Sequence, residues 1–353
     1  MYTMRFLCRQ RLKNNMRILF IFLCLFSFLV FPAINTAADV PLAISNVVPY
    51  LVRIETIGGH EKVGSEFANE GSSTGVLLDK EGHVITGAFN FLHDPTSILL
   101  VFPDGTKKVA QKIATDRLQM LTLLKAHDFI VNGFGENEMP PLPMRSKESL
   151  RIGERCIAIG AVLNSTEPNV ALGIISGKNR IWGTAIQTDA AIGPNNYGGL
   201  LIDADGKVLG IPVPLSMMSQ NVAAGAEMYD AGVGMAIPWA DVVALLPKLK
   251  EGKDLSPGSV GFAFKDNQIF IGEPVIAAIQ PDSPASKAGL QVGDKIVRID
   301  DVPILTALDV TKNLRLRYSD ETMKIVFLRG EVEQTVTLTT TGARERESGS
   351  RKM

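Results

Sequence analysis

The sequence contains few of the residues from which disulfide and metal sites are built. Only three of its 353 residues are cysteines and only four are histidines. The histidines show none of the paired spacings that metal-binding motifs use. They are His60, His83, His93 and His127. We therefore expect no metal ion and no cofactor.

Long blocks of like charge are also missing, so we expect no nucleic-acid partner. The one long apolar run is Ile18 to Phe31, which follows five basic residues and precedes the small residues Thr36, Ala37 and Ala38. This order is typical of a secretory signal, here residues 1–38, cleaved near Ala38. The alternative is an uncleaved anchor, although a membrane span needs about 20 apolar residues. Met4 and Met16 are alternative starts of translation.

Cleavage of this segment predicts a secreted or periplasmic protein. It would leave 31 basic and 37 acidic residues, a net charge of −6, and a single cysteine, Cys156. One cysteine cannot form an intramolecular disulfide. Because Cys156 lies in an apolar, strand-like run, we expect a buried and inert thiol.

Residues 39–250 contain many short runs of Val, Ile and Leu separated by turn signals such as Pro103-Asp104-Gly105. This pattern predicts an all-β barrel or sandwich. The runs are Leu51 to Ile54, Gly75 to Leu78, His83 to Thr86, Ile98 to Phe102, Leu121 to Leu124 and Cys156 to Ile159. A helix is expected from Trp239 to Leu249, before a linker at residues 251–258.

Residues 259–340 are predicted to form a second, α+β domain, with a disordered tail at 341–353. Strands are expected at Val275 to Ile279, Lys295 to Ile299, Met323 to Leu328 and Gln334 to Thr339, and a helix at Asp309 to Leu316.

The run from Ser283 to Ile296 resembles the S-P-A-x-x-A-G-L-x-x-G-D-x-I signature of PDZ domains. Such domains bind an extended peptide as an added strand, often by its C-terminal carboxylate. The resemblance implies a carboxylate loop at Val260-Gly261-Phe262-Ala263, with Val310 and Leu314 facing the peptide. The alternative is that these apolar residues belong to the core.

The first domain resembles the protease domain of the HtrA/Deg family. Four segments carry the resemblance, in the family's order: Val48 to Ile54, Ser73 to Leu78, Gln187 to Ile192 and Gly232 to Pro238. The third reads Q-T-D-A-A-I, as in the family. The resemblance implies a mainly β chain, a chymotrypsin-type double β-barrel followed by the PDZ domain.

The family's catalytic positions carry other residues here. Within otherwise matching motifs, Phe89 stands at the histidine, Met120 at the aspartate and Tyr197 at the serine position. Asn195 and Asn196 occupy the oxyanion turn, and we expect Asn195 to keep that turn because asparagine tolerates positive φ. Phe and Met cannot accept a proton, and Tyr without a base is a poor nucleophile. We interpret His83 and His93 as surface histidines, and Ser72, Ser73 and Ser176 have no companion base.

The replacements are bulky and largely apolar, which predicts a plug in the cleft between the barrels. Burial of apolar surface stabilises by about 25 cal/mol per Å². The alternative is that the three replacements are independent of one another and that their side chains do not touch.

The sequence therefore predicts an inactive serine protease homologue that binds peptides or unfolded clients. The resemblance implies two further partners, an active HtrA-type protease and further copies of the chain in a homotrimer. Two alternatives stay open: a residual or non-standard serine-type endopeptidase, and a structural subunit of an envelope assembly.

Overall fold

The computed structural model describes residues 40–58, 62–63, 66–67, 71–91, 95–129, 139–215, 232–264 and 272–342. The predicted signal at 1–38 and residues 343–353 of the predicted tail lie outside these ranges. The barrels and the C-terminal domain belong to one compact unit. None of the helices within the described ranges is long and apolar enough to cross a membrane.

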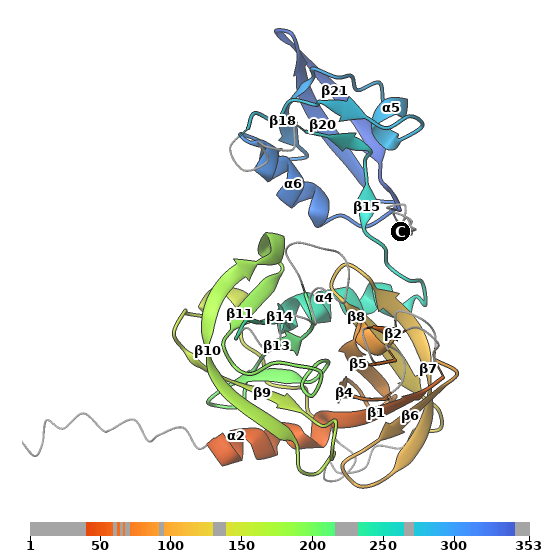
Figure 1. The fold of residues 1–353 in the computed structure, drawn as a ribbon, viewed down its shortest axis with the longest axis vertical. Coiled ribbons are helices and arrows are strands. Elements are labelled where there is room, and N and C mark those ends of the chain that lie inside the picture. Colours follow the sequence, from red (N-terminus) through yellow and green to blue (C-terminus); the bar gives the residue numbers. More distant parts are fainter. Residues whose placement is uncertain are drawn as a thin grey trace, which may run out of the picture. The chain divides into compact units, whose positions relative to one another are not determined.

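Two closed barrels of six antiparallel strands each form the first part of the chain, drawn from orange to gold and in green in Figure 1. A short helix, α2 (Val40–Val47), precedes them. The first barrel comprises β1 (Leu51–Ile57), β4 (Gly71–Leu77), β5 (His83–Gly87), β6 (Ser97–Val101), β7 (Lys107–Asp116) and β8 (Leu121–Ala126). The second comprises β9 (Arg155–Gly160), β10 (Asn169–Arg180), β11 (Ala185–Thr188), β12 (Leu200–Asp203), β13 (Val208–Pro212) and β14 (Gly234–Pro238). The predicted mainly β double barrel is confirmed.

Each barrel is filled by its own apolar core. In β1 the buried and less buried residues alternate along much of the strand, as expected when one face of a strand points inward. Val52, Ile54 and Leu100 belong to the core of the first barrel. Cys156, Ala158 and Leu201 belong to that of the second.

The barrels meet at a seam of close backbone contacts. Gly198 has φ of +77°, and a Cβ added to it would lie 2.2 Å from the Thr74 carbonyl oxygen and 2.4 Å from Thr86 Oγ1. Only glycine fits such an approach. The Thr86 hydroxyl donates to the Thr74 carbonyl at 2.6 Å, and the Thr74 hydroxyl accepts from the Ala161 N–H at 2.7 Å. The seam therefore ties β4 and β5 to the second barrel.

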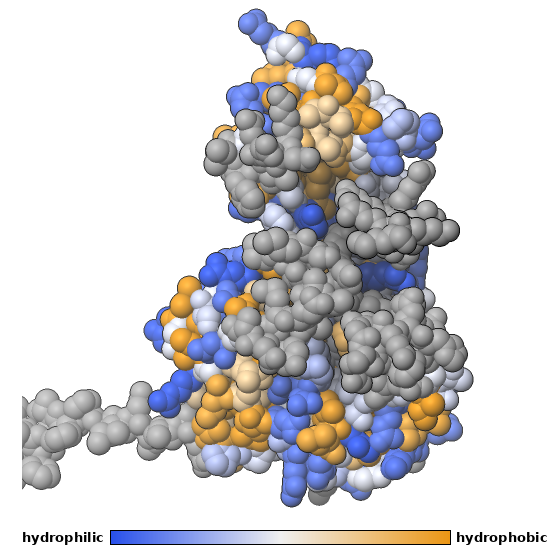
Figure 2. Space-filling view, in the orientation of Figure 1, coloured by the Kyte–Doolittle hydropathy of each residue, from blue (hydrophilic) through white to orange (hydrophobic). Residues whose placement is uncertain are grey.

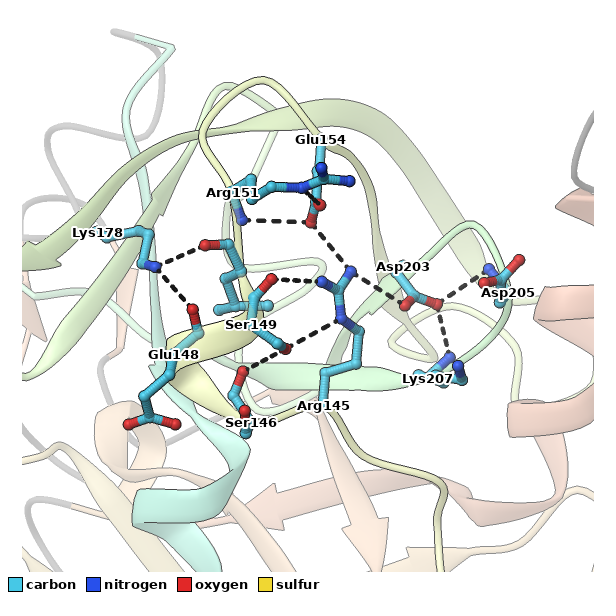
Figure 3. A network of polar contacts seen from close by, with 11 residues as sticks. Arg145, Ser146, Glu148, Ser149, Arg151, Glu154, Lys178, Asp203, Asp205 and Lys207 are labelled. Carbon is cyan, nitrogen blue, oxygen red and sulfur yellow. Dashed lines mark hydrogen bonds and ion pairs between the residues drawn. The ribbon is translucent and has the colours of Figure 1, made fainter.

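A polar network at the second barrel fastens the segment that leads into β9 (Figure 3). The Arg145 guanidinium binds the Glu154 carboxylate at 3.0 Å and the Asp203 carboxylate at 3.5 Å. Asp203 also accepts the N–H groups of Asp205 and Lys207, which closes the turn between β12 and β13. The network thus holds three stretches of the chain together.

The C-terminal domain, drawn in cyan and blue in Figure 1, contains a four-stranded sheet in the order β19-β18-β20-β21. The sheet comprises β18 (Lys295–Ile299), β19 (Val302–Pro303), β20 (Thr322–Arg329) and β21 (Val332–Thr339). Two-stranded pairs join β15 (Gly258–Ser259) to β22 (Thr341–Gly342) and β16 (Phe262–Ala263) to β17 (Ala278–Ile279). The helices are α5 (Pro284–Lys287) and α6 (Ala307–Arg315), after α4 (Trp239–Lys250) at the end of the barrels.

Several boundaries differ from the sequence predictions. The helix expected from Asp309 begins at Ala307, because Thr306 and Asp309 form a capping box. The strand expected at Val275 to Ile279 is reduced to Ala278–Ile279. Gly258, predicted to end the linker, opens β15, and its partner strand β22 lies in the predicted tail.

Candidate functional site

Phe89 lies in a short 3-10 turn, Ala88–Phe91, directly after β5. Its side chain is half-buried. The turn follows Gly87, which approaches Gly198 at the seam between the barrels. Phe89 therefore lies just beyond the end of β5, beside this seam.

Met120 ends the turn between β7 and β8 and is buried. The Asp116 carboxylate organises this turn, because it accepts the N–H groups of Leu118 at 2.7 Å and Gln119 at 3.1 Å. Met120 adopts a left-handed φ of +58°, and its carbonyl accepts the N–H of Ala88 at 2.8 Å. The backbone bond to Ala88 brings the Met120 position next to Phe89.

Tyr197 lies in the turn between β11 and β12, and only 5% of its surface is exposed. It packs in the core of the second barrel with residues such as Ile192 and Leu201. Its ring also approaches that of Phe89, with centroids 6.3 Å apart and planes tilted by 46°. Tyr197 thus links the second barrel core to the first barrel.

Phe89 and Tyr197, two members of the predicted plug, are therefore neighbours whose ring centroids lie 6.3 Å apart. Met120 is linked to this pair by the hydrogen bond between its carbonyl and the Ala88 N–H. Tyr197 lies deeper than the prediction of a cleft-filling side chain implied, because its ring is part of a barrel core. A plug in which all three side chains touch stays a prediction.

The backbone of the oxyanion turn is bonded within itself. The N–H groups of Asn196 and Tyr197 both donate to the Gly193 carbonyl, at 2.9 and 3.1 Å. In a serine protease the N–H at the nucleophile position holds the developing oxyanion. Here the Tyr197 N–H already has a carbonyl partner. Among the described residues Asn195 is not left-handed, contrary to our expectation, and Gly198 supplies the positive φ of this turn instead.

Two of the four histidines, His83 and His127, lie within the described ranges. His60 and His93 lie outside the described residues. His83 stands at the opposite end of β5 from Phe89, and its Nδ1 lies 2.8 Å from the Asp79 carboxylate. The ligand atoms of Asp79, Glu81 and His83 lie within 4.8 Å of one another. Lysines pair with both acids, Lys250 with Asp79 at 3.0 Å and Lys125 with Glu81 at 3.8 Å, so the group is a salt-bridge cluster.

Cys156 is buried, as predicted. Burial raises the pKa of its thiol to about 11, and the Sγ atom lies 3.0 Å from Thr188 Oγ1. A thiol with so high a pKa is protonated at neutral pH and is a weak nucleophile.

The predicted peptide-binding residues divide into two groups. Val260 and Val310 are buried in the core of the C-terminal domain. Gly261, Phe262, Ala263 and Leu314 are at least partly exposed. Gly261 has φ of +80°, and a Cβ added to it would lie 2.2 Å from the Ser283 Cβ, which explains the glycine in this loop.

One edge of β16 points away from β17. The carbonyls of Gly261 and Ala263 accept the N–H groups of Gln280 and Ala277, at 2.7 and 2.9 Å. In an antiparallel pair the intervening residue, Phe262, directs its N–H and C=O to the other side. Phe264, which our prediction missed, packs against Phe262 with ring centroids 5.5 Å apart. The spacing of two aromatic residues on one strand was the available signal.

The PDZ-like signature has a structural basis. The Ser283 hydroxyl accepts the Ser286 N–H and caps α5, Pro284 occupies the first turn, and Gly289 is left-handed with φ of +81°. Asp294 is buried and forms a two-point ion pair with Arg329, with both N–O distances at 2.8 Å. These residues build the domain, and the Ser283 hydroxyl also donates to the Gly261 carbonyl at 3.5 Å, directly before β16.

Comparison with known proteins agrees with both domains. Residues 73–211 match a trypsin-like peptidase domain and residues 258–340 match a PDZ domain. Serine endoprotease DegS of Escherichia coli (strain K12) is 26% identical over 320 residues, which cover 86% of each chain. A probable periplasmic serine endoprotease DegP-like of Pseudomonas fulva (strain 12-X) is 28% identical over 277 residues, 74% of this chain and 53% of that protein.

Solved structures agree in fold. The serine endoprotease from Yersinia pestis has a TM-score of 0.63 at 23% identity, covering 86% of this chain and 98% of that one. The HtrA-type protease AlgW with a tripeptide has a TM-score of 0.65 at 24% identity, covering 86% and 97%. The chain is thus a homologue of the DegS, DegP and HtrA proteins, in which a trypsin-like peptidase domain precedes a PDZ domain.

Proposed function

We propose that this protein is a non-catalytic HtrA-like protein that binds peptides, C-termini or unfolded clients in the cell envelope. The observation that carries the proposal is the state of position 197. The residue there is a buried tyrosine, and its backbone N–H donates to the Gly193 carbonyl. At this one residue, tyrosine stands in place of the serine nucleophile, and the N–H that would serve as an oxyanion donor is bonded to a carbonyl.

The neighbouring positions support the same conclusion. Acyl transfer by this type of enzyme needs a base that takes the proton of the nucleophile and an acid that orients the base. Phe89 and Met120 stand at those positions, and neither side chain can take up a proton. Removal of a single nucleophile or base costs on the order of a millionfold in a comparable enzyme.

Residues 212–215, at the end of β13, also offer no free backbone donor to an added peptide strand. Pro212 and Pro214 have no N–H. The N–H groups of Val213 and Leu215 donate to the carbonyls of Met235 and Val213, both at 3.0 Å. A peptide that lies along residues 212–215 therefore meets no free N–H on this stretch. This supports placing the client at the PDZ domain.

The PDZ domain offers the complementary arrangement. The backbone of Phe262 faces away from β17, and Phe262, Phe264 and Leu314 supply partly exposed apolar surface. An extended peptide could pair with this edge through its backbone and place apolar side chains against these residues. The AlgW structure was solved with a tripeptide, which supports the class of ligand.

Location and partners follow from the relatives. The DegP-like relatives are named as periplasmic, which suggests an envelope location. We include a homotrimer and an active protease of the same type among the proposed partners. On the face seen in Figure 2, apolar residues form separate patches on the barrels. The outer face of β10 exposes Val170, Leu172 and Ile174, which could serve such contacts.

A residual or non-standard serine-type endopeptidase is the second candidate, favoured by the relatives' names as serine endoproteases. Anisotropy of dye-labelled unfolded casein, mixed with the full chain and followed for hours, separates the two. A rise that holds supports binding without cleavage. A steady fall would mean cleavage and would overturn the proposal.

Two controls sharpen this experiment. A fluorophosphonate probe should label an active serine protease and leave this chain unlabelled. Phe262→Asp, which puts a charge on the β16 edge, should abolish the rise, whereas Val302→Asp, at an exposed position in β19 of the same domain, should preserve it. A rise that survives Phe262→Asp would refute the β16 edge as the client site.

A further inference from the structure

The segment predicted to be a linker is bonded on both of its sides. Toward the barrels, the Leu255 N–H donates to the Thr115 carbonyl at 2.9 Å and the Leu255 carbonyl accepts the Arg117 N–H at 3.0 Å. Toward the PDZ domain, the Ser256 carbonyl accepts the Ser319 N–H at 2.9 Å. Two β-bridges, Asp116–Leu255 and Pro257–Tyr318, describe the same arrangement. The segment thus pairs with the first barrel on one side and with the PDZ domain on the other.

A buried side-chain hydrogen bond joins the two outer parts directly. The Tyr318 hydroxyl of the PDZ domain donates to the Asp116 carboxylate of the first barrel at 2.6 Å. Asp116 is fully buried and Tyr318 is 9% exposed. The same carboxylate caps the turn that ends at Met120. A hydrogen bond to a buried charge is stronger than one between neutral groups.

Charged groups surround this bond. The Lys248 ammonium lies 5.0 Å from the centre of the Tyr318 ring and 3.2 Å from the Glu321 carboxylate. On the barrel side, the Asp254 carboxylate accepts the Thr115 N–H at 2.8 Å. The ion pairs are partly exposed, so their contribution is small compared with that of the buried bond.

A second contact lies at the end of α6, three residues before Tyr318. The Arg315 guanidinium of α6 lies 5.5 Å from the centre of the Trp182 ring. Trp182 and the preceding Ile181 are both left-handed, with φ of +63° and +47°. Such backbone persists only where surrounding contacts hold it. Arg315 and Tyr318, at the end of α6 and just after it, thus contact one barrel each.

We propose that Leu255–Pro257 is a structural strand, and that the Tyr318–Asp116 hydrogen bond locks the PDZ domain onto the barrel turn that carries Met120. The two domains then move as one body, and the β16 edge keeps a fixed position relative to the cleft. If the segment separated from the first barrel, the Asp116 carboxylate would be exposed. The four backbone groups that pair there, the Thr115 and Leu255 carbonyls and the Arg117 and Leu255 N–H groups, would face water. This inference does not depend on whether the chain is a protease or a binding protein.

Hydrogen exchange of the full chain, read at the N–H groups of Leu255, Arg117 and Ser319, tests the proposal. In the unmodified protein these groups should exchange slowly. Tyr318→Phe keeps the ring and removes the hydroxyl, and it should speed their exchange roughly tenfold or more. Tyr50→Phe is the matched control, because the Tyr50 hydroxyl is buried and donates to the Pro140 carbonyl within the first domain at 2.7 Å. It should leave the three groups unchanged.

Trypsin gives an independent readout, since Lys250 and Lys253 lie just before the segment. The unmodified chain and Tyr50→Phe should resist cleavage there, while Tyr318→Phe should be cut. Fast exchange or ready cleavage in the unmodified chain would show a flexible linker and overturn the proposal. Slow exchange that Tyr318→Phe leaves unchanged would overturn the role of the tyrosine.

Discussion

The turn that carries Tyr197 between the barrels and the β16 edge of the PDZ domain differ in which backbone groups they leave open to a peptide. At the cleft, Tyr197 is part of a core and its N–H is bonded to Gly193. At β16, the backbone of Phe262 faces away from its only partner strand among the described residues. The two closed barrels thus form with Phe89, Met120 and Tyr197 at these positions, because strand pairing uses backbone groups.

The largest effect is expected when the cleft is returned to a catalytic composition. The triple change Phe89→His, Met120→Asp and Tyr197→Ser should lower the free energy of unfolding, measured in urea. Tyr197→Ser alone should cost about 3–5 kcal/mol, as for other large aromatic residues removed from a core. Phe89→Ala, at a half-buried position, is the control and should cost less. A triple variant as stable as the original would contradict a stabilising role for these residues.

A smaller loss is expected from the PDZ signature itself. Burial would raise the pKa of Asp294, but hydrogen bonds from Arg329 and from the Gln291 N–H outweigh it and hold the pKa below its usual value. Asp294→Asn should therefore cost about 2–3 kcal/mol at neutral pH. The exposed Asp301→Asn is the matched control and should cost little.

The same residue predicts a response to acid. A carboxyl whose pKa is lowered by folding stabilises the protein above its unfolded pKa, about 3.9, and loses that contribution as the pH falls through the folded value. The free energy of unfolding, measured at pH 2–6, should fall on acidification in the original chain and fall less steeply in Asp294→Asn. Equal slopes for the two proteins would show that Asp294 does not cause the acid response.

An intermediate effect is expected at the β16 edge. Phe262→Ala removes apolar contact area and should weaken binding of a C-terminal peptide about tenfold, which corresponds to about 1.4 kcal/mol. Val302→Ala, at an exposed position in β19 of the same domain, should leave the dissociation constant unchanged. Fluorescence polarisation of a labelled peptide measures both. Equal affinities would mean that the client binds elsewhere.

The smallest effect concerns Asp116, at the junction of the two regions. Burial raises its pKa, against the opposing hydrogen bonds from Tyr318, Gln119 and Leu118 and the charge of Lys248. The native state then binds more protons than the unfolded state between about pH 3.9 and the raised value, so stability falls as the pH rises through that window. Asp116→Asn should change stability at pH 7 by less than about 1 kcal/mol and remove this fall. If the free energy of unfolding depended on pH in the same way in both proteins, Asp116 would not be the group that causes the fall.

Much of the fold could be predicted from local patterns. The short apolar runs and turn signals placed five of the six strands of the first barrel but only β9 of the second, and the S-P-A motif placed the α5 turn. Some of the missed boundaries involve a partner distant in the sequence or a capping side chain. Gly258, for example, is a strand residue only because Gly342 pairs with it. Asn195 was expected to be left-handed, but the seam between Thr74, Thr86 and Gly198 assigns that conformation to the glycine.

The sequence by itself determined which side chains stand at positions 89, 120 and 197, and therefore which proton transfers they cannot perform. It also determined the PDZ signature, since capping, proline and glycine act within a few residues. Only the tertiary structure decided that the Tyr197 N–H meets Gly193, that Val310 is core, and that residues 255–257 pair on both sides. The reason is that backbone donors and buried carboxylates select partners by position in space, and Asp116 and Tyr318 are 202 residues apart in the chain.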